Sequence, residues 1–147
     1  MAEATALLIG RVTYEEFAPF WSTRTAADDP GAEFMNATAK YVVSSTLRSA
    51  DWANSVVIDG NLDAQLTAVK AAMGGDLMIM GSAELVRALL SNGLLDRLTL
   101  ITHPIVLGKG KHLVEDGQPS TPLSLVGSQT LHSGVTVATY APAVEGR

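Results

Sequence analysis

The chain has 147 residues, of which 47% are apolar, and a formal net charge of −5, which suits a single acidic globular domain with a substantial core. This charge argues against nucleic acid or an anionic membrane as a partner, because both are bound through basic surfaces. The sequence has no cysteine, which excludes disulfides and thiolate sites, and no apolar run approaches the roughly 18 residues of a membrane-spanning helix, so we expect a cytoplasmic protein.

The chain opens with a predicted strand and helix. Residues 6–9 form a short apolar run without polar alternation, which is typical of a strand buried in a parallel sheet, and Gly10 ends the run. Thr13, followed three residues later by Glu16, predicts the N-cap of the next helix through a capping box. Pro19 is expected to bend or end this helix at the residue before it.

Three more strands alternate with helices in the middle of the chain. Apolar residues recur every three or four positions over residues 61–73, which indicates a helix, and Ser82 predicts the N-cap of another helix. The strands are predicted over residues 40–45, 55–60 and 76–81. Alternating strands and helices favour a mostly parallel sheet with helices on its faces.

The pattern changes in the last third of the chain. Residues 96–108 predict a long strand region interrupted by a proline, and residues 123–142 predict two alternating strands joined as a hairpin. We therefore expect an α/β fold in which a mixed, mostly parallel sheet flanked by helices ends in an antiparallel C-terminal hairpin. One domain would span residues 1–142, and residues 143–147 would form a tail.

Small and hydroxyl-bearing residues follow three of the predicted parallel strands. In open α/β sheets, ligands bind beyond the carboxyl ends of the strands, where small residues let a ligand approach the backbone and helix N-termini attract anions. Hydroxyl groups can donate to phosphate oxygens, and an arginine can make a forked contact with them. The pattern predicts a site for a ligand with several phosphates, such as a dinucleotide, formed by Gly10, Arg11, Thr13, Ser44, Ser45, Gly81, Ser82 and Ala83.

Each of these features also has a purely structural interpretation. Gly10 and Gly81 would permit tight turns, and the hydroxyl groups would cap helices or end a strand. The segment after the fourth strand does not match the dinucleotide fingerprint G-x-G-x-x-G, and Glu15 and Glu16 would weaken the attraction for an anion. Only the coincidence of three strand ends with Arg11 favours the functional interpretation.

Three stretches and the final hairpin follow the pattern of a known family. The stretches read LLIGRVTYEEF, KYVVSSTL and DLMIMGSAELVRALLSNGLLDRLTLITHPIVLGKGKHL. They resemble the dihydrofolate reductase superfamily, and within it the RibD C-terminal domain, which is the reductase of riboflavin biosynthesis. The resemblance implies an NADPH-dependent oxidoreductase with a small-molecule substrate, similar to 5-amino-6-(5-phosphoribosylamino)uracil reductase.

The resemblance also implies roles for the predicted site residues. Arg11 and Thr13 would hold the phosphates of NADPH, with Arg11 on the 2′-phosphate, and Ser44 and Ser45 would line the same 2′-phosphate. Residues 81–83 would face the pyrophosphate at a helix N-terminus. The family pattern shows two or three glycines in this last segment, whereas the present chain has one.

Family members generally begin with a further strand and helix, about a quarter of the domain, that contribute to the substrate pocket. We expect this chain to lack that N-terminal strand and helix, and an exposed apolar sheet edge would then favour a homodimer. The pattern identifies no catalytic proton donor, and it predicts no metal site, because His112 and His132 lack metal-ligand spacing. The alternatives to a reductase are a non-catalytic nucleotide-binding module, a degenerate remnant of the fold, or a structural domain whose strand ends are only turns.

Overall fold

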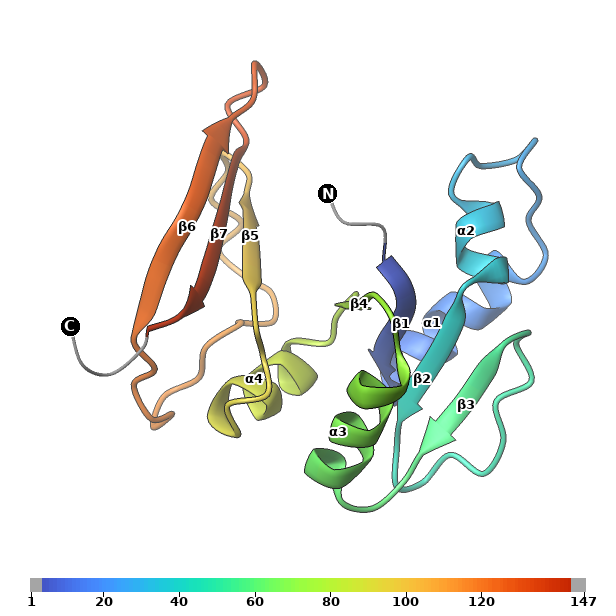
Figure 1. Ribbon diagram of the computed structural model, residues 1–147. Helices are drawn as coiled ribbons and strands as arrows, with labels where there is room; N and C mark the ends of the chain where they lie inside the picture. The colour runs from blue at the N-terminus through green and yellow to red at the C-terminus, as the bar shows by residue number, and fades with distance from the viewer. Residues whose placement is uncertain (1–3, 144–147) are drawn as a thin grey trace. The chain divides into compact units, whose positions relative to one another are not determined.

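The computed structural model describes residues 4–143 of the chain, which forms two compact units, residues 1–85 and 86–147 (Figure 1). Each unit has its own β-sheet. Of the expected tail at 143–147, only Ala143 lies within the described residues. Within this described part of the chain, no helix is both long and apolar enough to cross a bilayer.

The first unit is built on a parallel four-stranded sheet in the order β3-β2-β1-β4. The strands are β1 (Ala4–Gly10), β2 (Ala39–Val43), β3 (Ser55–Ile58) and β4 (Asp76–Ile79). The helices are α1 (Arg11–Trp21), α2 (Ala32–Ala37) and α3 (Leu62–Ala72), and α4 (Ala83–Ser91) begins at the end of this unit. Because β1 pairs with β2 on one edge and with β4 on the other, it is a central strand of this sheet.

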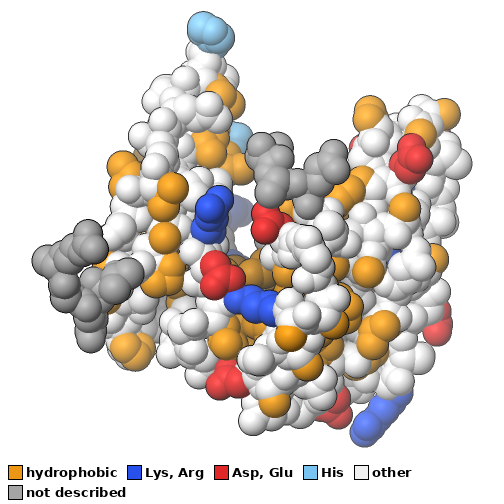
Figure 2. Space-filling view, viewed as in Figure 1, with side chains coloured by type: hydrophobic (Ala, Val, Ile, Leu, Met, Phe, Trp, Pro, Cys, Tyr) orange, Lys and Arg blue, Asp and Glu red, His pale blue; other side chains and the backbone are white. Residues whose placement is uncertain are grey.

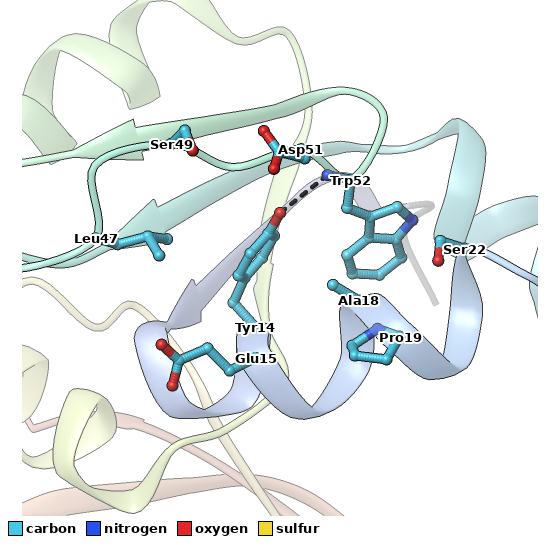
Figure 3. A pocket seen from close by; sticks show the side chains of 9 residues that line it. All are labelled: Tyr14, Glu15, Ala18, Pro19, Ser22, Leu47, Ser49, Asp51 and Trp52. Atoms are coloured by element: carbon cyan, nitrogen blue, oxygen red, sulfur yellow. Dashed lines mark hydrogen bonds between the residues drawn. The ribbon is translucent and has the colours of Figure 1, made fainter.

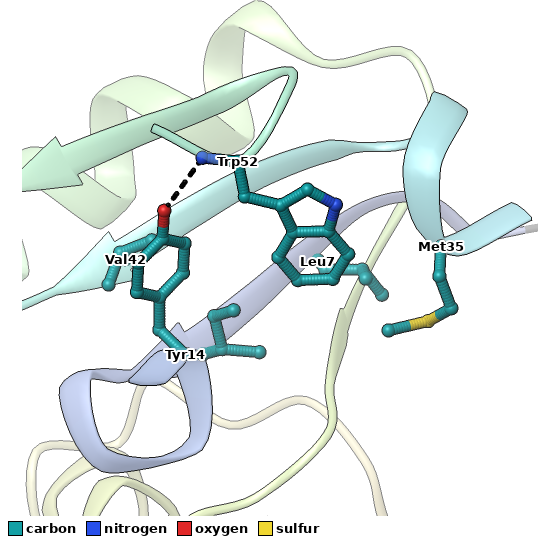
Figure 4. Close-up of a cluster of buried hydrophobic side chains, with 6 residues drawn as sticks. Leu7, Tyr14, Met35, Val42 and Trp52 are labelled. Carbon is teal, nitrogen blue, oxygen red and sulfur yellow. Dashed lines mark hydrogen bonds between the residues drawn. The ribbon is translucent and has the colours of Figure 1, made fainter. Parts of the chain in front are cut away.

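The central strand β1 is buried on both faces, as its apolar sequence predicts. Residues 6–9 are at most 2% exposed. Leu7 and Ile9 point into one hydrophobic cluster (Figure 4), whereas Leu8 points to the opposite face, because side chains alternate along a strand. The cluster is completed by Tyr14, Met35, Val42 and Trp52. Burial of each large aliphatic side chain contributes about 1.5–3 kcal/mol to folding, so β1 anchors the unit.

Trp52 joins three segments around this cluster. Its backbone N–H donates to the Tyr14 hydroxyl oxygen at 2.9 Å, and its indole N–H donates to Asn36 Oδ1 at 2.7 Å. The Asn36 amide group in turn donates to the carbonyl oxygens of Trp21 and Arg24. These contacts satisfy polar groups that would be costly to bury unpaired, and they fix the connection between β2 and β3 against α1 and α2.

Lys40, in β2, is a fully buried cation. Its Nζ donates to the carbonyl oxygens of Met35 at 2.8 Å and Thr38 at 2.7 Å, and it lies 4.4 Å from the ring centre of Trp52. A cation is favoured both at a helix C-terminus and over an indole ring. Burial nevertheless lowers the pKa of Lys40 from its ordinary value of 10.5, because removal from water penalises the charged form. Lys40 therefore caps the last turn of α2 from within the core.

The second unit is built on an antiparallel sheet in the order β5-β7-β6. Its strands are β5 (Leu98–Thr102), β6 (Leu123–Thr130) and β7 (Thr136–Pro142). An ion pair of 2.8 Å between Arg87 of α4 and Glu115 ties the long connection between β5 and β6 to the helix. Leu125 and Val126 of β6 are exposed. Figure 2 shows hydrophobic side chains gathered in a column over the hairpin that β6 forms with β7.

The predicted α/β class, with a parallel sheet followed by an antiparallel C-terminal hairpin, is confirmed. The antiparallel strands pair with one another in a sheet of their own rather than with the parallel strands. The hairpin turns through Gly134, whose φ of +81° favours glycine. Several strands are shorter in the structure than the sequence predicts. They end at Val43, Ile58, Ile79 and Thr102.

The start of α1 differs from the sequence prediction. The helix begins at Arg11 with Gly10 as its N-cap, and no side chain caps it. The predicted N-cap role of Thr13, and with it the capping box to Glu16, is therefore wrong. β1 passes directly into α1 without a connecting loop, which places Thr13 inside the first helical turn, where it is buried.

Of the two effects expected of Pro19, the ending of the helix at the preceding residue is wrong. The helix continues to Trp21, whose side chain packs with those of Phe17 and Ala18 against the hydrophobic cluster. Proline within a helix removes one backbone hydrogen bond, and we attribute the continuation of α1 to this packing. Tertiary contacts thus outweigh the local preference at this position.

Replacing Lys40 with methionine tests its role as an internal cap. We expect Lys40→Met to lower the free energy of unfolding by about 2 kcal/mol, because the carbonyl oxygens of Met35 and Thr38 would remain buried without this donor. Urea unfolding followed by tryptophan fluorescence measures the change. Arg48→Met is the matched control, because it removes an exposed cation of the same unit and should change the free energy by less than about 0.5 kcal/mol. Equal losses in the two variants would contradict the role.

The lowered pKa of Lys40 also predicts a pH dependence. Between that lowered pKa and 10.5, the unfolded chain retains a proton that the folded chain has lost, so the contribution of Lys40 to the free energy of unfolding rises with pH across this window. Below the window both states are protonated and the contribution is constant. The difference in unfolding free energy between the wild type and Lys40→Met should therefore grow as the pH is raised toward 10.5 in urea titrations. A shrinking difference would mean that the carbonyl contacts favour the ammonium form instead.

Candidate functional site

The carboxyl ends of three parallel strands meet at one edge of the sheet in the first unit. Gly10 at the end of β1 is in register with Val43 at the end of β2, and Leu8 of β1 pairs with Ile79 at the end of β4. The predicted binding residues directly follow these ends: Arg11 and Thr13 after β1, Ser44 and Ser45 after β2, and Gly81, Ser82 and Ala83 after β4. The structure thus brings the predicted residues to the edge at which open α/β sheets bind ligands.

The first turn of α1 and the segment leading into α4 approach each other closely. A Cβ atom on Gly10 would lie 3.3 Å from Ser82 Oγ, and a Cβ atom on Gly81 would lie 3.5 Å from Thr13 Oγ1. Gly81 also has a φ of +79°, a conformation that favours glycine. We call this arrangement of Gly10, Thr13, Gly81 and Ser82 the cradle, and a side chain at position 10 would begin to fill it.

Two helices start at the cradle, and their N-termini differ in capping. The N-cap of α1 is Gly10, which has no side chain to accept a hydrogen bond from the first N–H groups of the helix. In α4, Ser82 Oγ accepts from the N–H of Leu85 at 3.3 Å, which confirms the predicted N-cap, and the Gly81–Ser82 peptide bond is cis. The uncapped N–H groups and the dipole of α1 favour an anion beside the cradle.

The two serines after β2 have different surroundings. Ser44 Oγ accepts the N–H groups of Thr46 at 3.1 Å and Leu47 at 2.9 Å, and Ser44 is 9% exposed. Its hydroxyl proton can be donated to Thr46 Oγ1, 3.4 Å away, or to a ligand. Ser45 is exposed. Ser44 therefore fixes the loop after β2, whereas Ser45 offers its hydroxyl group to solvent.

Arg11 already has an anionic partner. Its Nη1 lies 2.7 Å from Oε2 of Glu15, one turn further along α1, and the two side chains are 42% and 48% exposed. The sequence predicts only that Glu15 weakens the attraction for an anion, although its spacing of four residues from Arg11 is itself the signal for such a pair. A guanidinium group has five N–H donors, so Arg11 retains donors for a second anion.

A separate hollow lies between α1 and the connection from β2 to β3 (Figure 3). It has a volume of about 540 Å³ and is lined by Tyr14, Glu15, Ala18, Pro19, Ser22, Leu47, Ser49, Asp51 and Trp52. Its lining residues include two carboxylates and no basic side chain, and although Arg11 pairs with one of them, Glu15, the lining itself offers no cation to a phosphate group. The cradle, rather than this hollow, is therefore the candidate site for a ligand that carries phosphates.

Comparison with known proteins assigns the sequence of this chain to a family. The chain matches the model of the RibD C-terminal domain family over residues 1–137. The uncharacterized protein YyaP of Bacillus subtilis is 29% identical over 139 residues, which cover 91% of this chain and 72% of that relative.

Solved structures share the fold. A putative riboflavin biosynthesis protein from Shewanella sp. PV-4 matches with a TM-score of 0.77 and 18% identity, covering 97% of this chain and 76% of that one. Dihydrofolate reductase from Enterococcus faecalis, complexed with NADP(H) and RAB-propyl, matches with a TM-score of 0.59 and 16% identity, covering 95% of this chain and 74% of that one. These structures show a fold of the dihydrofolate reductase type. Because the family model matches nearly the whole sequence, the chain belongs to the RibD C-terminal domain family.

Proposed function

We propose that this chain is an NADPH-dependent reductase that transfers a hydride to a carbon–nitrogen or carbon–oxygen double bond of a small molecule. By resemblance to the RibD reductase, the proposed substrate class is a phosphoribosylaminopyrimidine. Family membership supports a reductase, and the NADP(H) bound to the enterococcal dihydrofolate reductase supports the choice of cofactor.

The observation that carries the proposal is the cradle at the converging strand ends. It combines uncapped N–H groups at the start of α1 with two glycines at the point of closest approach. These residues fit a dinucleotide, because a pyrophosphate needs backbone donors and an approach without Cβ atoms. Glycine at position 10 leaves such an approach open, because a Cβ atom there would occupy the space beside Ser82 Oγ, at a distance of 3.3 Å from it.

The proposed roles divide the cofactor between the strand ends. Residues 81–83 and the start of α1 would hold the pyrophosphate, and Arg11, with Ser44 and Ser45, would hold the 2′-phosphate. When bound, the nicotinamide supplies the hydride, and the protein supplies orientation and electrostatics. The guanidinium of Arg11 and the dipole of α1 both offset the negative charge of the phosphates.

Turnover separates this proposal from a non-catalytic nucleotide-binding module, which would use the same cradle. The purified chain is mixed with NADPH and 5-amino-6-(5-phosphoribosylamino)uracil, and the loss of NADPH absorbance is followed while the reduced product is identified by mass spectrometry. Consumption of NADPH that depends on the pyrimidine supports the reductase. Tight NADPH binding without consumption would overturn the reductase and leave the binding module.

The placement of the 2′-phosphate predicts a selective effect of Arg11. Arg11→Ala should weaken NADPH binding at least about tenfold, since a hydrogen bond to a charged group contributes about 1.5–3 kcal/mol, and should leave NADH binding unchanged. Fluorescence titration of both nucleotides measures the dissociation constants. Arg48→Ala removes another exposed cation of the same unit and serves as the control. Equal affinity of the wild type for NADPH and NADH would contradict this placement.

The cradle predicts that a single methyl group added at position 10 weakens the binding of NADPH. Gly10→Ala should weaken NADPH binding by about tenfold, because the added Cβ lies 3.3 Å from Ser82 Oγ and narrows the approach to the backbone. The φ of Gly10 is −77°, so alanine is compatible with the backbone and the variant should fold. Gly74→Ala is the control, because a Cβ atom there meets nothing within 4 Å. Similar affinities of the two variants for NADPH would argue against a ligand in the cradle.

A further inference from the structure

The ion pair between Arg11 and Glu15 involves the residue that is proposed to hold the 2′-phosphate of the cofactor. Arg11 is the first residue of α1, and Glu15 follows one turn later on the same face of the helix. The contact of 2.7 Å is that of a charge-assisted hydrogen bond. A second acidic residue, Glu16, is equally placed in the first half of α1 and exposed, yet the described residues show no hydrogen bond or ion pair of its side chain.

We propose that Glu15 is a specificity-determining residue that competes with the 2′-phosphate of the cofactor for Arg11. The carboxylate occupies the guanidinium while no phosphate is bound, and it sets how strongly the site prefers NADPH to NADH. This inference rests on the proposed function, because it takes Arg11 as the group that binds the 2′-phosphate.

The competition follows from the charges involved. A phosphate monoester carries nearly two negative charges at neutral pH, and Glu15 would place a third negative charge against the same cation. The phosphate must therefore displace the carboxylate from Arg11 or share the guanidinium with it against like-charge repulsion. A nucleotide without the 2′-phosphate places no anion there and leaves the pair intact. Glu15 thus reduces the affinity for NADPH and leaves that for NADH unaltered.

The size of the effect is limited by solvent. Both side chains are more than two-fifths exposed, and an exposed pair of this kind contributes about 0.2–1 kcal/mol, or at most about a fivefold change in an equilibrium constant. Salt screens such pairs over a Debye length of about 8 Å at physiological ionic strength. The preference set by Glu15 should consequently decline as salt is added.

Glutamine substitutions at the two neighbouring acidic positions test the inference. Glu15→Gln keeps the size and helix propensity of the side chain and removes its charge, and Glu16→Gln makes the same change in net charge without touching Arg11. We expect Glu15→Gln to lower the dissociation constant of NADPH about threefold to fivefold at low salt, and to change that of NADH by less than about twofold. Glu16→Gln should change both constants by less than about twofold. Fluorescence titration at low and high salt measures these values, and thermal unfolding confirms that the variants are folded.

The double variant separates this inference from the function on which it rests. If Glu15 acts through Arg11, Glu15→Gln should have no effect on NADPH affinity in the Arg11→Ala background. An equal gain from Glu15→Gln and Glu16→Gln, or an unchanged or weakened NADPH affinity in Glu15→Gln, would overturn the competition while the effect of Arg11→Ala alone still stands. If Arg11→Ala itself leaves NADPH binding unchanged, the proposed placement of the cofactor fails instead.

Discussion

The arrangement of the first unit depends on the burial of β1 between two parallel neighbours. Its residues 6–9 are almost completely withdrawn from water, so both faces of this strand are covered, and side chains of α1 cover the face of Leu7 and Ile9. Parallel pairing on both edges then aligns the ends of β1, β2 and β4. The same constraint that builds the core therefore places the predicted phosphate-binding segments side by side.

The contacts around Trp52 also fix the segments that connect the strands of the first unit. Tyr14 of α1 and Asn36 of α2 both hydrogen-bond to Trp52, while Lys40 reaches the same indole ring from β2. Because Ser44 directly follows β2 and binds the backbone of its own loop, its loop has a defined place relative to α1. A candidate site made of short loop segments is thus held by the contacts of a buried tryptophan some residues away.

The strands and the helix caps with clear local signals could be predicted from the sequence, whereas features that depend on tertiary packing could not. The apolar run of β1 and the cap of α4 by Ser82 need only local information. Thr13 resembles an N-cap in sequence, but β1 runs straight into α1, and the N-cap is Gly10, three residues earlier. The burial of Lys40 has no local signal at all, because a lysine at the start of a strand normally faces water. The site residues follow from the positions of strand ends, but their partners, such as Glu15 for Arg11, require the helix geometry.

The burial of Lys40 has a practical consequence for chemical labelling. A reagent that acylates free amines needs contact with the nucleophilic nitrogen, which in Lys40 is enclosed by carbonyl oxygens and an indole ring. Lys109 and Lys111 lie in an exposed connection and are open to the same reagent. Acylation of Lys40 therefore requires α2 to separate from β2, and peptide mass spectrometry at this one position would report how often that local opening occurs in the native protein.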